Sequence, residues 1–185
     1  MKTAYISKKH ILMVCHQMVQ TYGIQSITIR AVAKQCNVSI GSIYNYFPSK
    51  NKLLHEVIES IWKDIFKMPN DIMTYDFMKC LQWMCDSIQK GKQKYPDFLK
   101  SHAMVFHNDE RIEGQQHMEY CIEHMKQCLL TILQHDQAVK DNVFNEQLTR
   151  QQFVSYILTL FLSSITNMSI SQVGIMQLVK HCLYE

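Results

Sequence analysis

Glycine and proline are scarce in this chain, which has five glycines and three prolines among its 185 residues. This scarcity, together with 47% hydrophobic residues and no alternating polar and apolar pattern, argues against a β-rich fold. No apolar run is long enough to span a membrane, and the start of the chain lacks a signal-peptide core. The seven cysteines show no disulfide-framework spacing. We therefore expect an all-α protein of the reducing cytoplasm.

Acidic residues are few in the N-terminal third. Residues 1–67 contain nine Lys or Arg and three Asp or Glu, a net charge of +6. Residues 68–185 contain ten and thirteen, a net charge of −3, so that the two parts sum to the overall +3. A basic N-terminal part joined to an acidic remainder predicts a polyanion-binding domain attached to a domain with another task.

The segment 28–54 carries the strongest local pattern. Apolar residues at helical spacing over 29–36 predict one short helix, and Ser39 is suited to cap a second. Asn37 tolerates the left-handed backbone of a tight turn between them. Pro48 ends the second helix before a long helix over 50–66 begins. Two short helices joined by a tight turn predict a helix-turn-helix, whose second helix enters the major groove of DNA.

Residues at fixed offsets make this pattern specific. They are Gly23, Thr28, Gly41 and the run Tyr44-x-Tyr46-Phe47-x-Ser49-Lys50-x-x-Leu53-Leu54. Over these positions the chain resembles the DNA-binding segment of the tetracycline-repressor (TetR) family of bacterial transcriptional regulators. The resemblance covers about a quarter of the chain. It implies an all-α protein with a three-helix head, a linker helix and a six-helix body that binds an effector and forms a homodimer.

This organisation leads us to expect a helix-turn-helix domain over 1–49 and a linker helix plus effector-binding and dimerisation domain over 50–185. Amphipathic patterns predict the body helices, and the segment 137–145 is expected to be a loop. The expected body helices span about 73–91, 96–107, 113–136, 146–167 and 169–184.

The outer face of the helix-turn-helix supplies the candidate DNA-binding residues, with hydroxyls and an ammonium for phosphates and an amide for base edges. They are Thr28, Arg30, Ser39, Ile40, Gly41, Tyr44, Asn45, Tyr46 and Lys50. The resemblance implies that Thr28, Tyr44 and Lys50 face phosphate. Asn45 is suited to reading adenine. Gly41 has no side chain, which allows the backbone to approach the groove closely.

Two of these candidates have a plainer interpretation. Ile40 could touch a thymine methyl group or be an ordinary, partly buried residue, and Tyr46 could belong half to the core. Because one short helix reads few base pairs, we expect a homodimer on a palindromic operator. Apolar stripes on the last two helices are the dimer-interface candidates, with internal core as the alternative. Their residues are Phe153, Ile157, Leu160, Phe161, Ser164, Met168, Val173, Met176 and Val179.

The body is rich in soft and aromatic residues, which suit a small apolar or aromatic effector but are also common in an ordinary core. The candidate effector-pocket residues are Trp62, Phe77, Trp83, Met84, Phe98, His102, Phe106, Tyr120, Cys121 and His124. No cofactor is expected. A ligand-responsive regulator, most simply a repressor released by its effector, is the predicted function. A further hypothesis is a DNA-binding protein that has no effector.

A stripe of histidines and cysteines supports an alternative in which the regulator senses a metal or haem. His117, Cys121, His124 and Cys128 lie on one face of the expected helix and are ligand types for zinc, copper or haem iron. A Cys-His-dependent enzyme is the rival class. No Gly-rich phosphate loop, paired carboxylates or nucleophile elbow supports it, so we expect no enzymatic activity.

Overall fold

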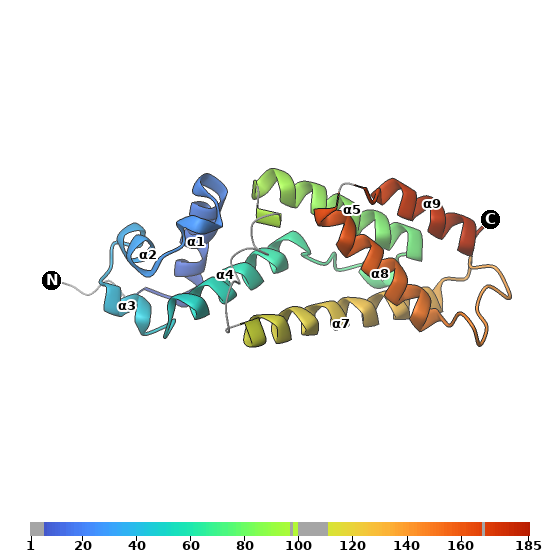
Figure 1. Cartoon of the computed structure of the whole chain (residues 1–185), viewed down its shortest axis with the longest axis horizontal. Coiled ribbons are helices and arrows are strands. Elements are labelled where there is room, and N and C mark those ends of the chain that lie inside the picture. The colour runs from blue at the N-terminus through green and yellow to red at the C-terminus, as the bar shows by residue number, and fades with distance from the viewer. Residues whose placement is uncertain (1–5, 97, 100–110, 168) are drawn as a thin grey trace. The chain divides into compact units, whose positions relative to one another are not determined.

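The computed structural model describes residues 6–96, 98–99, 111–167 and 169–185, with the backbone alone over 111–121. Its described part contains eight α-helices, two short 3-10 helices and no strand, which confirms the predicted all-α class (Figure 1). The 3-10 helices are η1 (Ile24–Ser26) and η2 (Ile72–Thr74). The α-helices are α1 (Lys8–Tyr22), α2 (Ile29–Gln35), α3 (Ile40–Tyr44), α4 (Lys50–Ile65), α5 (Phe77–Lys94), α7 (Arg111–His135), α8 (Arg150–Thr166) and α9 (Gln172–Leu183).

The chain forms two compact units. The first comprises residues 1–65 and 90–117, and the second comprises residues 66–89 and 118–185. The helix-turn-helix and α4 therefore belong to one unit, together with the end of α5. The domain boundary expected between residues 49 and 50 stays a prediction. The helix expected over 96–107 falls almost wholly outside the described residues.

The core of the first unit forms where α1 packs against α2 and α4. The side chains of α4 that repeat every three or four residues are buried, as an amphipathic stripe requires. Ile11, Cys15, Val19, Val32, Ile43, Phe47, Leu53, Val57 and Ile61 are all completely buried. This continuous apolar core holds the two short helices in place, since helices of seven and five residues are not stable alone.

Aromatic rings organise the core of the second unit. Phe153 on α8 lies 6.1 Å from Phe77 and 5.7 Å from Phe144, measured between ring centroids. The carboxylate of Asp136 accepts hydrogen bonds from the Phe77 amide at 2.9 Å and from the Tyr184 hydroxyl at 2.5 Å. This carboxylate therefore ties the start of α5 to the C-terminal end of the chain.

Helix α8 begins later than the sequence pattern predicted, at residue 150 and not near 146. The Asn145 side chain accepts hydrogen bonds from the amides of Gln147 and Leu148, and the Asn145 amide donates to the Leu148 carbonyl, which closes a turn over residues 145–148 before the helix begins. Thr149 then caps the helix in a reciprocal pair with Gln152. Local side-chain hydrogen bonds thus override apolar periodicity at this end.

Most of the residues proposed for the dimer interface are buried within the single chain. Phe153, Ile157, Phe161, Ser164 and Val179 are each at most 9% exposed. They belong to the core of the second unit, as the alternative interpretation expects, and a dimer interface on α8 and α9 stays a prediction. Leu160, Val173 and Met176 remain accessible, and Met168 lies outside the described residues. Sequence periodicity identified the apolar faces of α8 and α9 but could not tell which partner covers them.

Candidate nucleic-acid interface

The turn between α2 and α3 has the backbone that its sequence predicts. Asn37 has a φ of +54°, in the left-handed region that asparagine tolerates better than most residues. The Val38 amide donates to the Ala33 carbonyl at 3.0 Å, and the Asn37 amide donates to the Lys34 carbonyl at 3.1 Å. These two bonds form a Schellman cap that ends α2 and redirects the chain into α3.

Hydroxyl side chains cap the N-termini of α2, α3 and α4. The side-chain oxygens of Thr28, Ser39 and Ser49 accept hydrogen bonds from the amides three residues later, at distances of 3.0–3.1 Å. Each bond satisfies one free amide at a helix start. The caps therefore fix where α2, α3 and α4 begin, and with them the direction of the exposed face.

Helix α3 has clearly separated inner and outer faces. Ile43 and the following Phe47 are completely buried, whereas Ile40 and Tyr44 are 44% and 48% exposed. Gly41 and Asn45 are also exposed. A Cβ atom added at Gly41 would meet only the Ser39 hydroxyl, at 3.8 Å. The outward orientation expected from helical spacing is thus present, and contact of these residues with DNA stays a prediction.

Tyr46 is engaged inside the protein. It is half-buried, and its hydroxyl donates a hydrogen bond to the backbone carbonyl of Ile6. The single hydroxyl proton is therefore used by the segment before α1 and is not free for a phosphate oxygen. Tyr46 thus links the N-terminal segment to the end of the helix-turn-helix, and its contact with phosphate stays a prediction.

The electrostatics of this surface favour an anionic partner. No Asp or Glu occurs before Glu56, and the Glu56 carboxylate lies 2.5 Å from Lys8 Nζ. Lys8 is therefore ion-paired, whereas Arg30 and Lys50 are exposed cations on the outer surface of the helix-turn-helix. Lys34 and Lys52 add two charges that the sequence analysis did not single out. Both could have been found by counting the charged residues of the segment 28–54.

The effector-pocket candidates are divided between the two units, and their role in binding an effector stays a prediction. Trp62 and Phe98 meet in the first unit with ring centroids 5.9 Å apart, whereas Trp83 contacts Phe66 in the second at 6.1 Å. Phe77 and Met84 are completely buried, and His124 is exposed. His102 and Phe106, like the side chains of Tyr120 and Cys121, lie outside the described residues.

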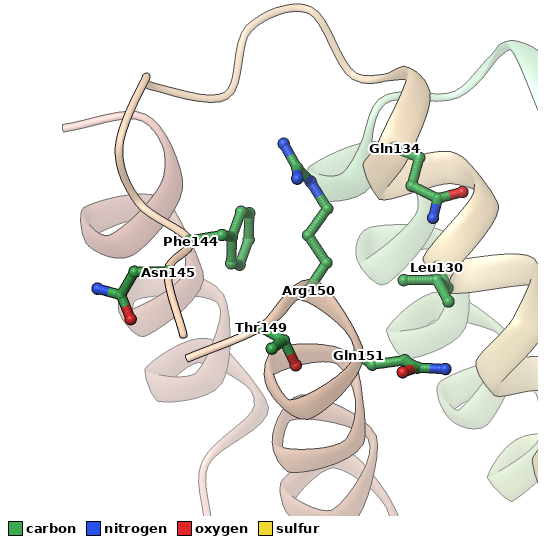
Figure 2. A pocket seen from close by; sticks show the side chains of 7 residues that line it. All are labelled: Leu130, Gln134, Phe144, Asn145, Thr149, Arg150 and Gln151. Carbon is green, nitrogen blue, oxygen red and sulfur yellow. The ribbon is translucent and has the colours of Figure 1, made fainter. Parts of the chain in front are cut away.

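A pocket of about 500 Å³ does occur in the second unit, and its described lining residues include none of these candidates (Figure 2). It lies between the end of α7, the loop before α8 and the first turn of α8. Figure 2 shows the Arg150 side chain beside the Phe144 ring, and the guanidinium carbon is 4.8 Å from the ring centroid. The remaining lining residues are Leu130, Gln134, Asn145, Thr149 and Gln151. Sequence reasoning missed this pocket because the loop carries no recognisable motif.

The histidine and cysteine stripe contains one close pair among its described side chains. His124 Nδ1 lies 3.9 Å from Cys128 Sγ, and the side chains of His117 and Cys121 lie outside the description. Within the described residues, no three His, Cys, Asp or Glu side chains converge as metal ligands. Burial raises the pKa of the Cys128 thiol, which is opposite to the shift of an activated thiolate. The pair therefore lends no support to metal sensing or to thiol catalysis.

Comparisons with known proteins agree with this geometry. Residues 11–57 match the family model described as bacterial regulatory proteins, tetR family. Nucleoid occlusion factor SlmA from Aliivibrio fischeri is 29% identical over 108 residues, which cover 55% of each chain. SlmA from Vibrio campbellii is 29% identical over 124 residues, covering 58% of this chain and 63% of the relative. The chain thus spans between half and two thirds of the length of these curated relatives.

A solved structure shares the fold over nearly the whole chain. It is a protein assigned as a transcriptional regulator from Saccharomonospora viridis, crystallised in complex with choline. The TM-score is 0.57 at 12% identity, with 96% of this chain and 97% of that chain covered. No helix of the described residues is both long and apolar enough to cross a membrane.

Proposed function

We infer that this chain is a transcriptional regulator that binds a palindromic operator as a homodimer. Its residues 11–57 match the tetR family of bacterial regulatory proteins and contain the helix-turn-helix. The observation that carries this proposal is the outer face of α3. It presents Ile40, Tyr44 and Asn45 beside Gly41, on a surface that has exposed cations and no carboxylate before Glu56.

The side chains divide into two roles. Lys50 and Tyr44 offer an ammonium and a hydroxyl to phosphate oxygens, which sets the position on the duplex without reading sequence. Asn45 offers an amide that can pair with both polar atoms on the major-groove edge of adenine. Because the helix is short, each subunit reads few base pairs, and a second copy is needed for specificity. The accessible apolar residues of α8 and α9 are the candidate dimer face.

The test of these roles is enrichment of duplexes from a random-sequence library. The wild-type protein is expected to enrich an inverted repeat. Asn45→Ala should lose preference at one A·T position of each half-site, whereas Lys50→Ala should weaken binding to all sequences alike. Lys63→Ala, an exposed α4 cation paired with Glu59, is the matched control. Enrichment of no sequence by the wild-type protein would refute the proposal.

We also propose that a small apolar or aromatic effector controls the DNA affinity, most simply by releasing the regulator from its operator. The aromatic clusters of the chain support this class of ligand. A neighbour of the same fold was crystallised with a small molecule, the choline cation, which supports a small-molecule effector but not its apolar or aromatic class. An effector can change DNA affinity only by binding two conformations of the protein with different affinities. Helix α4, which begins next to the recognition helix, is the proposed connection. We expect this regulator to act in the cytoplasm without catalysis.

The two tryptophans provide a direct assay for the effector, because one lies in each unit. Trp62 packs against Phe98 in the first, and Trp83 packs against Phe66 in the second. Fluorescence titration of Trp62→Phe and Trp83→Phe variants with a library of aromatic and aliphatic compounds would identify the unit that responds. A response that also lowers operator affinity supports the proposal, and operator affinity unchanged by every binding compound contradicts it.

A second candidate function comes from the curated relatives, which are named nucleoid occlusion factors. In this alternative the protein binds DNA without regulating transcription and needs no effector. The two functions differ in where the protein binds. A regulator occupies few sites next to the genes that it controls, whereas sites scattered through the chromosome without regard to promoters would favour the alternative.

A further inference from the structure

A chain of polar side chains joins α1, α4 and the residue that follows α5, all within the first unit. The Tyr95 hydroxyl donates to Asp64 Oδ2 at 2.7 Å and lies 3.0 Å from Nδ1 of His16. The other ring nitrogen, Nε2 of His16, is 2.7 Å from the Ser60 hydroxyl. Lys94 Nζ contacts the same Asp64 oxygen at 2.7 Å. None of these side chains has a part in the DNA-binding face.

The hydrogen atoms of this chain can be assigned by counting donors. Asp64 is an acceptor, because hydrogen bonds from Lys94 and Tyr95 and the Lys94 charge outweigh the opposing effect of burial and lower the pKa of its carboxyl. The only hydroxyl proton of Tyr95 therefore goes to Asp64, and its oxygen can only accept from His16. Nδ1 of His16 must carry a proton. Nε2 of a neutral ring is then an acceptor for the Ser60 hydroxyl.

Burial keeps the ring neutral. It lowers the pKa of His16, an effect increased by the Lys94 charge and opposed by the Asp64 carboxylate. Asp64, Lys94 and Tyr95 are the titratable groups that face the ring from α4, α5 and the residue after α5. The Ser60 hydroxyl also lies within donating distance of the Val57 carbonyl, at 2.8 Å, so its single proton is shared between that carbonyl and Nε2 of the neutral ring. A second proton on Nε2 would make the ring the donor and commit the Ser60 proton to Val57.

We propose that Tyr95 is a positioning residue for the DNA-binding head: held by Asp64, it fixes the Nδ1–H tautomer of His16 and so joins α1 to α4 and to the end of α5. Tyr95 is completely buried, and its ring meets the His16 ring edge-on with centroids 5.7 Å apart, so packing restricts how the two rings can orient. Because α1 packs against both α2 and α4, a fixed α1 holds the helix-turn-helix at one angle to α4. This inference rests on the proposed binding to DNA.

The tautomer can be observed directly in the full-length protein. Long-range ¹⁵N–¹H spectra of the imidazoles at pH 7.5 should show the Nδ1–H form for His16 in the wild-type protein. In Tyr95→Phe the acceptor at Nδ1 is lost, and the proton should move to Nε2, where Ser60 can accept it. Tyr22→Phe is the matched control, since Tyr22 on α1 is 73% exposed. An Nε2–H form in the wild type, or no change in Tyr95→Phe, would overturn the proposal.

The effect on DNA binding is the second readout, measured by anisotropy on a labelled duplex that the wild-type protein enriches from a random library. Tyr95→Phe should lower the affinity by about 2- to 12-fold, the range for one lost hydrogen bond, and Tyr22→Phe should not. Ser60→Ala should keep the Nδ1–H tautomer and lower the affinity similarly; it also decides the matter if Tyr95→Phe does not fold. Unchanged affinity in both variants would refute the positioning role. Absence of any wild-type binding would instead refute the proposed function, while the tautomer result stands separately.

Discussion

Removing the Lys50 charge should change the salt dependence of DNA binding in a calculable way. Lys50 is the first residue of α4, is exposed, and has no carboxylate within ion-pair distance among the described residues. Each phosphate that a cation neutralises contributes about −0.9 to the slope of log affinity against log salt concentration. Two copies of Lys50 in the proposed dimer should therefore account for a slope of about −1.8.

This slope gives a definite expectation for Lys50→Ala. Between 50 and 200 mM salt, the affinity of the wild-type protein should fall about 12-fold more than that of the variant, because a fourfold change in salt is raised to the power of about 1.8. The assay is fluorescence anisotropy on one duplex at four or more salt concentrations. Lys63→Ala, on the same helix but ion-paired with Glu59, should keep the wild-type slope.

The variant should lose affinity without losing stability. A cation in the first turn of a helix opposes the helix dipole, so replacing Lys50 by alanine should leave the unfolding midpoint unchanged or slightly raised. A wild-type slope in Lys50→Ala, in a protein that is folded and binds the duplex, would refute the assignment of Lys50 to a phosphate. A lower midpoint would show that the loss of affinity arises from unfolding.

Three further predictions concern stability. Gly41→Ala should raise the free energy of unfolding by about 0.5–1 kcal/mol, because an added Cβ meets only the Ser39 hydroxyl. The same variant should weaken operator binding in anisotropy titrations, and tighter binding would contradict close approach of the backbone to DNA. Asn37→Ala should lower the free energy of unfolding by about 1–2 kcal/mol in urea titrations, because Asn37 has a positive φ, whereas Asn37→Gly should cost less; equal losses would contradict the turn argument. The folded state lowers the pKa of His16, so its stabilising effect is complete above the unfolded pKa of about 6.5 and is lost as the pH falls below it. The difference in stability between wild type and His16→Gln should therefore narrow from pH 7.5 to 5.5, by at most about 1.4 kcal/mol per pH unit, and a constant difference would refute the shift.

The sequence predicted best where local chemistry determines the backbone. Asn37 at a left-handed turn and Ser39 and Ser49 at helix starts need only neighbours within four residues, and all three occupy the predicted positions. The inner and outer faces of α3 follow from helical spacing in the same way. Tyr46 was harder to place, because its hydroxyl partner, the Ile6 carbonyl, is distant in sequence.

Features that depend on contacts between distant segments could not be predicted. Periodicity showed that Phe153 and Phe161 face an apolar environment, but not that α8 buries them within its own unit. The joint around His16 brings together residues from α1, α4 and the end of α5, and no spacing in the sequence relates them. The pocket beside Arg150 likewise depends on a loop fold that begins with the Asn145 side chain.

Selection of bound genomic fragments tests the central claim most directly. Purified full-length protein would be mixed with sheared chromosomal DNA from the source organism, and the retained fragments would be sequenced. Tyr44→Ala combined with Lys50→Ala is the control, since both side chains are exposed and their loss leaves the core intact. The account predicts strong enrichment of a few fragments that share an inverted repeat, absent for the double variant. Retained fragments with no common sequence, or the same fragments retained by the double variant, would contradict it.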